Sequence, residues 1–191
     1  MTDHTRPPSD ARADAATDRS EPLTDQSVDE EPTTVLHVEP DPRSAELLDT
    51  FARRLADRVR VRSVDRFADA LDAVATGVEV DGERVAVNCV VTEQRLPGGS
   101  GVELTERLRE AGRGLPVVFY TTCPGEESEA AAFGAGADAY FEKGSDRGRY
   151  DAILDRIRAL VAERRDRDPT ARAASTPRAS GTPGETLRSE E

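Results

Sequence analysis

Residues 34–55 read TVLHVEPDPRSAELLDTFARRL and hold the pattern on which the fold prediction depends. The first five residues form an almost continuous apolar run, which is typical of a strand that is covered on both faces. Pro42 then suits the first turn of a helix. Beyond it, apolar residues recur at spacings of three and four and predict one buried stripe: Leu47, Leu48, Phe51 and Leu55. The stretch therefore predicts a strand followed by a helix.

The same order of strand and helix recurs along the chain. Further apolar runs predict strands at residues 59–64, 86–92, 115–121 and 139–142. Helices are predicted around Phe67, Leu71 and Val74, around Leu104 and Leu108, over residues 125–133, and along the stripe Tyr150, Ile153, Leu154, Ile157, Leu160 and Val161. Five strands alternating with five helices predict an α/β fold: a doubly wound five-stranded parallel sheet with helices on both faces.

Two connecting segments are read from their turn residues. Residues 77–85 contain Asp81-Gly82 between short arms that carry valines, which is compatible with either a small hairpin insertion or a loop. Residues 96–99, Leu-Pro-Gly-Gly, are predicted to form a loop after the third strand.

The two ends of the chain differ from its middle in composition. Residues 1–32 hold nine acids and almost no large apolar residue, so they cannot bury enough surface to offset the entropy of ordering. Residues 164–191 become rich in small and polar residues. We therefore expect one domain over residues 33–163, between a disordered acidic N-terminal tail and a disordered C-terminal tail.

Charge and cysteine content exclude several functions. The formal net charge of -12 argues against direct nucleic-acid binding, because phosphate contacts need a clustered positive surface. An acidic excess with Arg far above Lys is also typical of proteins from extreme halophiles. Cys89 and Cys123 are too few for a disulfide framework, and no apolar signal segment or membrane anchor is visible, so a cytoplasmic location is expected.

Polar side chains follow the predicted strands at the edge where doubly wound sheets form their sites. They are Glu39 and Asp41, then Glu93, then Thr121 and Thr122, and finally Lys143, the only lysine of the chain. Carboxylates, a hydroxyl and an ammonium in one crevice suit a divalent cation and a phosphoryl group. Each residue also has a structural explanation, since Glu39 and Asp41 are compatible with helix capping and Thr121 with a simple strand end.

The segments that carry these residues are 35–42 (VLHVEPDP), 90–101 (VVTEQRLPGGSG), 119–121 (FYT) and 136–143 (GADAYFEK). Together they resemble the receiver domains of response regulators, the phospho-accepting modules of two-component signalling, over about residues 33–162. The resemblance implies a flavodoxin-like receiver fold with strand order 2-1-3-4-5. It also implies phosphoryl contacts for Thr121 and Lys143, and a change of rotamer on activation for Tyr140.

Two residues depart from the family pattern. Glu93 stands where the family has its phospho-accepting aspartate, and its side chain is longer by one methylene, roughly 1.3 Å by backbone bond lengths. Pro40 stands where the family has a metal-binding acid, so Mg²⁺ binding by Glu39, Asp41 and Glu93 is expected to be weak or lost. We hypothesise that Glu93 pairs directly with Lys143 and partly imitates a phosphorylated site. A decayed site on a surviving scaffold is the alternative.

Two functions of different classes are compatible with these residues. The first is a non-enzymatic signalling module that contacts histidine kinases or other signalling proteins in trans, without direct contact to nucleic acid or membrane. The second is a small doubly wound enzyme or a flavin- or nucleotide-binding protein. The second lacks a glycine-rich phosphate loop after the first strand, and Cys123 has no evident histidine partner because His37 is expected to pack in the core.

Overall fold

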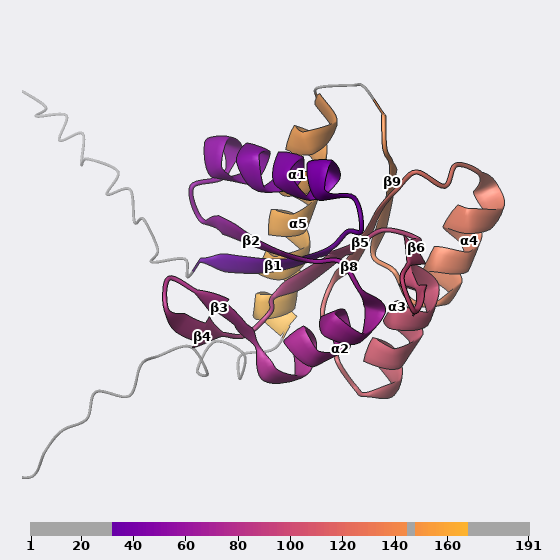
Figure 1. Ribbon diagram of the computed structural model, residues 1–191, viewed down its shortest axis with the longest axis horizontal. Helices are drawn as coiled ribbons and strands as arrows, with labels where there is room; N and C mark the ends of the chain where they lie inside the picture. The colour runs from indigo at the N-terminus through magenta and orange to yellow at the C-terminus, as the bar shows by residue number, and fades with distance from the viewer. Residues whose placement is uncertain (1–31, 145–147, 168–191) are drawn as a thin grey trace, which may run out of the picture. The chain divides into compact units, whose positions relative to one another are not determined.

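The computed structural model describes residues 32–144 and 148–167, and these contain one five-stranded parallel sheet. Its strand order is β2–β1–β5–β8–β9, which is the predicted order 2-1-3-4-5 (Figure 1). The strands are β1 (Thr33–Val38), β2 (Val59–Val64), β5 (Cys89–Thr92), β8 (Val117–Thr121) and β9 (Ala139–Glu142). All four neighbouring pairs are parallel, so the predicted fold class is confirmed.

Helices cover both faces of the sheet (Figure 1). One face is covered by α1 (Pro42–Leu55) and α5 (Gly148–Arg167). The other face is covered by α2 (Phe67–Thr76), α3 (Gly101–Glu110) and α4 (Glu126–Gly134). Because α5 continues to Arg167, residues 164–167 belong to a helix and not to the predicted tail. Of the two predicted tails, residues 1–31 and 168–191 lie outside the described residues. No described helix has the length and apolar content needed to cross a membrane.

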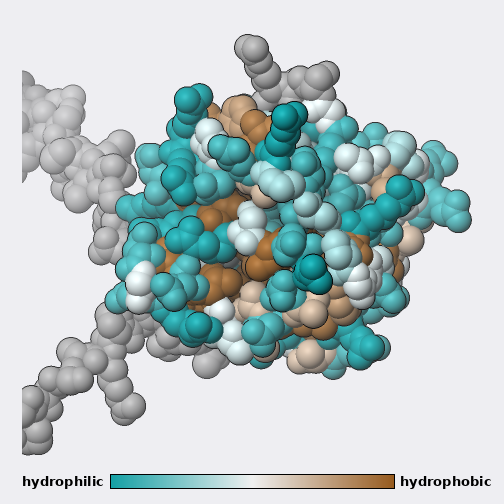
Figure 2. Space-filling view, in the orientation of Figure 1, coloured by the Kyte–Doolittle hydropathy of each residue, from teal (hydrophilic) through white to brown (hydrophobic). Residues whose placement is uncertain are grey.

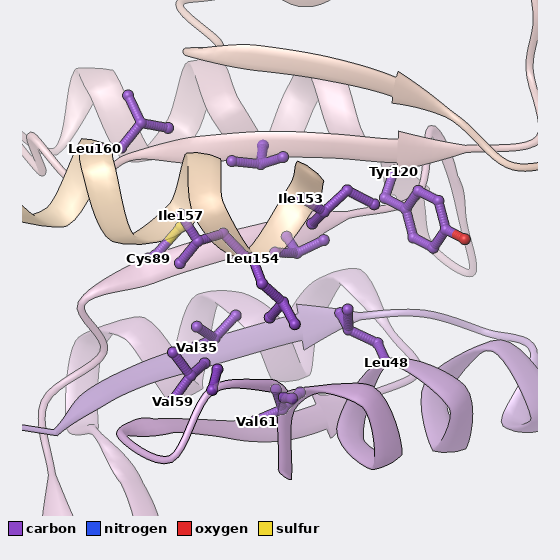
Figure 3. Close-up of a cluster of buried hydrophobic side chains, with 14 of the residues drawn as sticks. Val35, Leu48, Val59, Val61, Cys89, Tyr120, Ile153, Leu154, Ile157 and Leu160 are labelled. Atoms are coloured by element: carbon purple, nitrogen blue, oxygen red, sulfur yellow. The ribbon is translucent and has the colours of Figure 1, made fainter. Parts of the chain in front are cut away.

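Two apolar cores form because successive side chains of a strand point to opposite faces. In β1, Val35 joins the core under α1 and α5, whereas Leu36 joins the core under α2 and α3. Figure 3 shows the first of these cores, to which Val35, Leu48 of α1 and Ile157 of α5 all belong. Val35 and Leu36 of β1 are both fully buried, as are Leu48 and Ile157. Burial on both faces of the sheet explains why β1 is apolar at consecutive positions.

The segment 77–85 forms a hairpin, which decides between the two alternatives left open by its sequence. The strands β3 (Val78–Val80) and β4 (Glu83–Val85) pair antiparallel across a two-residue turn. Asp81 and Gly82 both have positive φ, 52° and 84°, as tight hairpin turns require. Val78 and Val80 are buried in the core under α2 and α3, so the hairpin extends the cover of that face.

One predicted loop is a hairpin in the structure, and two predicted strands begin later than expected. Residues 96–99 lie in a second, very short hairpin, β6 (Arg95–Leu96) with β7 (Gly99–Ser100), instead of a plain loop. The third and fourth strands begin at Cys89 and Val117, later than predicted. In the third, the Asn88 side chain accepts a hydrogen bond from the Thr34 backbone, 2.7 Å. A side chain that satisfies the neighbouring strand in this way replaces a regular ladder contact there.

Gly101 sits where the start of α3 passes close to the end of β5. A Cβ atom at this position would lie 2.6 Å from the Glu93 backbone oxygen and 2.8 Å from the Phe119 ring. We expect Gly101→Ala to lower the free energy of unfolding by about 1–3 kcal/mol, because overpacking forces backbone shifts. Urea unfolding measures the effect, and Gly114→Ala is the matched control, since nothing lies within 4 Å of its added methyl. Equal stabilities of the two variants would contradict this account of the contact.

Candidate functional site

The carboxyl ends of four strands bring the predicted site residues to one edge of the sheet. Glu39 follows β1, Glu93 follows β5, Thr121 ends β8, and Lys143 follows β9. Backbone hydrogen bonds fix these ends: the Glu93 N–H donates to Val38 O at 3.0 Å, and the Lys143 N–H donates to Thr121 O at 2.6 Å. The sheet therefore positions side chains that are more than 100 residues apart in sequence, as the Lys143–Glu39 contact shows.

The Glu93 carboxylate lies at the centre of this edge and is almost completely buried. Its Oε1 accepts hydrogen bonds from the Thr121 hydroxyl and from the Gln94 N–H, the latter at 2.7 Å. Its Oε2 accepts from the Thr122 N–H at 3.0 Å and lies 3.0 Å from Lys143 Nζ. A hydroxyl, two backbone N–H groups and an ammonium thus converge on one anion, which is the donor set that stabilises a buried negative charge.

Lys143 contacts two carboxylates instead of one. Its ammonium forms an ion pair with Glu39 Oε2 as well as with Glu93 Oε2, and its side chain is only 11% exposed. The ammonium also lies 5.5 Å from the centre of the Tyr120 ring, within the range of a cation–π contact. Two buried carboxylates therefore share a single cation, an arrangement that the pairing hypothesis for Glu93 alone did not include.

The pKa values show how the three charges divide. Burial alone would raise the pKa of Glu93, but hydrogen bonding by Thr121 and the ammonium of Lys143 hold it below its usual value. Burial raises the pKa of Glu39, and Lys143 offsets this only in part. Although burial opposes it, pairing with both carboxylates raises the pKa of Lys143. Glu93 is thus the firmly ionised carboxylate, and Glu39 is the one that accepts a proton more readily.

The residues at this edge do not fit a bound Mg²⁺. Asp41 is exposed and caps α1, accepting hydrogen bonds from the Ser44 backbone at 3.0 Å and from its hydroxyl at 2.8 Å. These bonds to Ser44 lower the pKa of Asp41. Pro40 offers no side-chain oxygen, and the ammonium of Lys143 already neutralises Glu39. Among residues 32–144 and 148–167, no group of three or more His, Cys, Asp or Glu side chains is arranged to hold a metal ion.

Tyr140, the predicted switch residue, connects this edge to the loop before α4. Its hydroxyl donates to the Cys123 backbone oxygen at 2.5 Å, and its half-buried ring stacks on Phe119 with centroids 5.9 Å apart. The Cys123 N–H in turn donates to Thr121 Oγ1 at 3.0 Å. One chain of hydrogen bonds therefore links Glu93, through Thr121 and Cys123, to Tyr140.

His37 is fully buried, as expected for a core residue, but it is not satisfied by a partner. Within the described part of the chain, neither ring nitrogen has a hydrogen-bond partner, and Nε2 lies 3.8 Å from Glu39 Oε2. Burial, reinforced by the nearby charge of Lys143, lowers the pKa of His37 to about 3. The ring is therefore neutral at neutral pH.

Sequence reasoning missed three contributions to the site. The backbone N–H groups of Gln94 and Thr122 carry no signal in the residue types, because any residue except proline supplies one. The pairing of Glu39 with Lys143 was also missed, since Glu39 was considered only as a metal ligand or a capping acid. The sequence does contain a signal for this pairing, because its single lysine follows one strand and a glutamate directly follows each of two others. The sequence analysis paired Lys143 with Glu93 alone.

Comparisons with known proteins identify the same family as the residues do. The sequence matches the response regulator receiver domain over residues 35–155, which is more than half of the chain. The probable transcriptional regulatory protein TcrX of Mycobacterium tuberculosis (strain ATCC 25618 / H37Rv) is 29% identical over 133 residues. The match covers 70% of this chain and 51% of that protein, so the chain spans about half the length of this curated relative.

Solved structures share the fold at low sequence identity. A response regulator receiver domain protein (CheY-like) from Methanospirillum hungatei JF-1 superposes with a TM-score of 0.59 at 19% identity, covering 72% of this chain and 100% of that one. A putative response regulator from Chloroflexus aurantiacus J-10-fl gives 0.57 at 24% identity, with 69% and 99% covered. These likenesses concern the fold alone.

Proposed function

Because the chain belongs to the response regulator receiver domain family, we propose that it is a two-component signalling module in which Glu93 takes the place of a phosphoryl group. The observation that carries the proposal is the set of contacts to the Glu93 carboxylate. Thr121 and Lys143, the residues to which the family resemblance assigns phosphoryl contacts, both bind this carboxylate. The longer side chain of glutamate supplies an anion there without a phosphoryl donor.

A fixed anion at this place biases the switch region of the domain. A switch responds to any group that interacts differently with its two states. Here the Glu93 carboxylate accepts hydrogen bonds from the Thr121 hydroxyl and the Thr122 N–H. The Thr121 hydroxyl oxygen accepts from the Cys123 N–H, and the Cys123 carbonyl accepts from the Tyr140 hydroxyl. We infer that the loop after β8 and the start of α4 are kept in one state, independently of phosphorylation.

The module acts through protein–protein contacts in this proposal. Its partners are histidine kinases or other signalling proteins in trans, in the cytoplasm, and no catalytic step or tightly bound Mg²⁺ is required of it. The relative from Mycobacterium tuberculosis is described as a transcriptional regulatory protein. That description belongs to a longer protein, and the output of the present chain is proposed only as contact with a partner.

We expect the protein to remain unmodified when it is incubated with acetyl phosphate and Mg²⁺ and its intact mass is measured. The reason is that both oxygens of the Glu93 carboxylate already accept hydrogen bonds or pair with Lys143. In addition, Pro40 offers no side-chain oxygen to bind Mg²⁺. The shorter side chain of Glu93→Asp withdraws the carboxylate from Lys143, and the double variant Glu93→Asp/Pro40→Asp also restores an acid after β1. We expect a phosphoryl adduct on the double variant.

The control is Glu93→Gln, which keeps the side-chain length but removes the acceptor charge and gains no adduct. If the single variant Glu93→Asp is modified as fully as the double variant, loss of the metal ligand is not the limiting defect. A stoichiometric, magnesium-dependent adduct on Glu93 of the unaltered protein would refute the proposed function.

A further inference from the structure

The helices on the two faces of the sheet carry opposite charge. α1 and α5 together hold nine arginines and six acids, although the whole chain has a net charge of -12. α2, α3 and α4 together hold eight acids and two arginines. The cationic and acidic helices lie on opposite sides of the sheet (Figure 1), so the helices on the two faces carry net charges of opposite sign.

The cationic side carries an apolar stripe along α1. Leu47 and Leu55 are 46% and 42% exposed, and Phe51 lies between them at helical spacing, stacked on Tyr150 of α5 with centroids 4.2 Å apart. Arg54 lies one turn beyond Phe51 on the same side. We call Leu47, Phe51, Arg54 and Leu55 the α1 stripe. Arg158 of α5 flanks its end, donating to Leu55 O at 2.9 Å.

The acidic side carries a matching feature on α4. Within this fully described helix only Ala132 is buried, so most of its circumference faces outward. Phe133 is 45% exposed. Among the described residues, the exposed large hydrophobic side chains are Leu47, Leu55 and Phe133. Helical spacing places Glu126 and Glu129 on the same side as Phe133. We call Glu126, Glu129 and Phe133 the α4 surface.

We propose that the α4 surface of one copy docks on the α1 stripe of a second copy. Each surface offers an apolar anchor, and the charges around the two anchors are opposite. Pairing either surface with itself would instead bring like charges together, which is unfavourable. Because the two surfaces lie on different faces of one domain, the contact is heterologous and runs head to tail. The proposal is independent of the proposed role of Glu93.

The contact is expected to be weak and sensitive to salt. The face drawn in Figure 2 is mainly hydrophilic, with hydrophobic colour limited to smaller areas between polar side chains. With only Leu47, Leu55 and Phe133 as exposed large hydrophobic side chains among the described residues, we expect the contact to belong to the small, transient class of interfaces. At 0.1 M salt the Debye length is about 10 Å. Repulsion between acids farther apart than this is therefore screened, whereas the attraction between opposite charges in contact across the interface remains.

Sedimentation velocity of the full chain tests the proposal. We expect the weight-average mass to rise above one chain between about 10 µM and about 500 µM protein in about 0.1 M salt, a range suited to micromolar and weaker affinities. The rise should disappear at about 1 M salt, where the Debye length is about 3 Å. A monomer at every concentration in the lower salt would overturn the proposal and leave the two surfaces to other partners.

Charge-reversal variants separate this contact from other modes of self-association. Arg54→Glu/Arg158→Glu alters the α1 side and Glu126→Arg/Glu129→Arg alters the α4 surface, and each variant alone should lose the rise in mass. An equimolar mixture should regain it, because each variant keeps the surface that the other has lost and both alterations are complementary. Restored association also shows that both variants are folded.

The matched control for Arg54→Glu/Arg158→Glu is Arg66→Glu/Arg95→Glu, which changes the net charge by the same amount at two exposed positions outside both surfaces. This control should associate like the unaltered chain. Two results would overturn the proposal: a variant that still associates on its own, or a mixture that stays monomeric when the unaltered chain associates.

Discussion

Replacing Lys143 by methionine is expected to lower the free energy of unfolding by about 3–5 kcal/mol near pH 7.5, the range found when one partner of a buried ion pair is removed. The substitution keeps an unbranched side chain but deletes the charge that Glu39 and Glu93 share. Two almost fully buried carboxylates are then left side by side without a cation. Urea unfolding measures the loss, and Arg66→Met is the matched control because it removes an exposed cation outside the α1 stripe and the α4 surface.

The sign of the pH dependence follows from the raised pKa of Lys143. A cation whose pKa is raised on folding contributes stability that is complete below its unfolded pKa, near 10.4, and is lost as the pH rises through the folded value. The unaltered protein therefore keeps the contribution throughout the neutral range. In Lys143→Met the deficit should shrink as the pH falls toward 5, because one of the two facing carboxylates, Glu39 first, takes up a proton.

A second substitution identifies the origin of the deficit. Glu39→Gln in the Lys143→Met background removes one of the two facing charges, so we expect the double variant to be more stable than Lys143→Met alone. If the double variant is less stable by the sum of the two single effects, the residues do not interact. In that case the loss in Lys143→Met comes from packing and not from the shared charge.

The fold followed from the sequence where periodicity and composition agreed. The continuous apolar run at residues 34–38 marks the fully buried strand β1, and the run at residues 139–142 appears as the partly buried edge strand β9. The stripe from Tyr150 to Val161 appears within α5. Both predictions rest on local patterns that tertiary packing reinforces. The sheet alone is compatible with several doubly wound proteins, and it is the match to the response regulator receiver domain over residues 35–155 that identifies the family.

The candidate site was predictable in position but not in pairing. The rule that sites form at the carboxyl ends of strands placed Glu39, Glu93, Thr121 and Lys143 at one edge, where the structure also has them. The sequence could not tell that Asp41 turns to cap α1 while Glu39 turns toward Lys143. That choice depends on which partner each carboxylate reaches in three dimensions. The two acids are two residues apart and look alike in sequence.

His37 is expected to make the protein lose stability as the pH falls below neutrality. Its pKa drops from an ordinary value of 6.5 to about 3 in the folded state. Below pH 6.5 the unfolded chain therefore gains a proton on this ring that the folded protein does not bind, so acid favours unfolding. At pH 4.5 the linkage amounts to about 2.7 kcal/mol, two pKa units at about 1.36 kcal/mol each.

The effect is separated from the other titrating groups by comparing the protein with His37→Val. The substitution leaves a volume defect whose cost does not depend on pH, whereas the proton linkage disappears with the ring. Urea unfolding at pH 7 and pH 4.5 should therefore show the stability of the variant relative to the unaltered protein improving by about 2.7 kcal/mol on acidification. Glu39 and Lys143 remain in both proteins, so their titration largely cancels in the difference. A stability difference that is the same at both pH values would mean that the ring is protonated in the folded state, most simply by pairing with Glu39, 3.8 Å away.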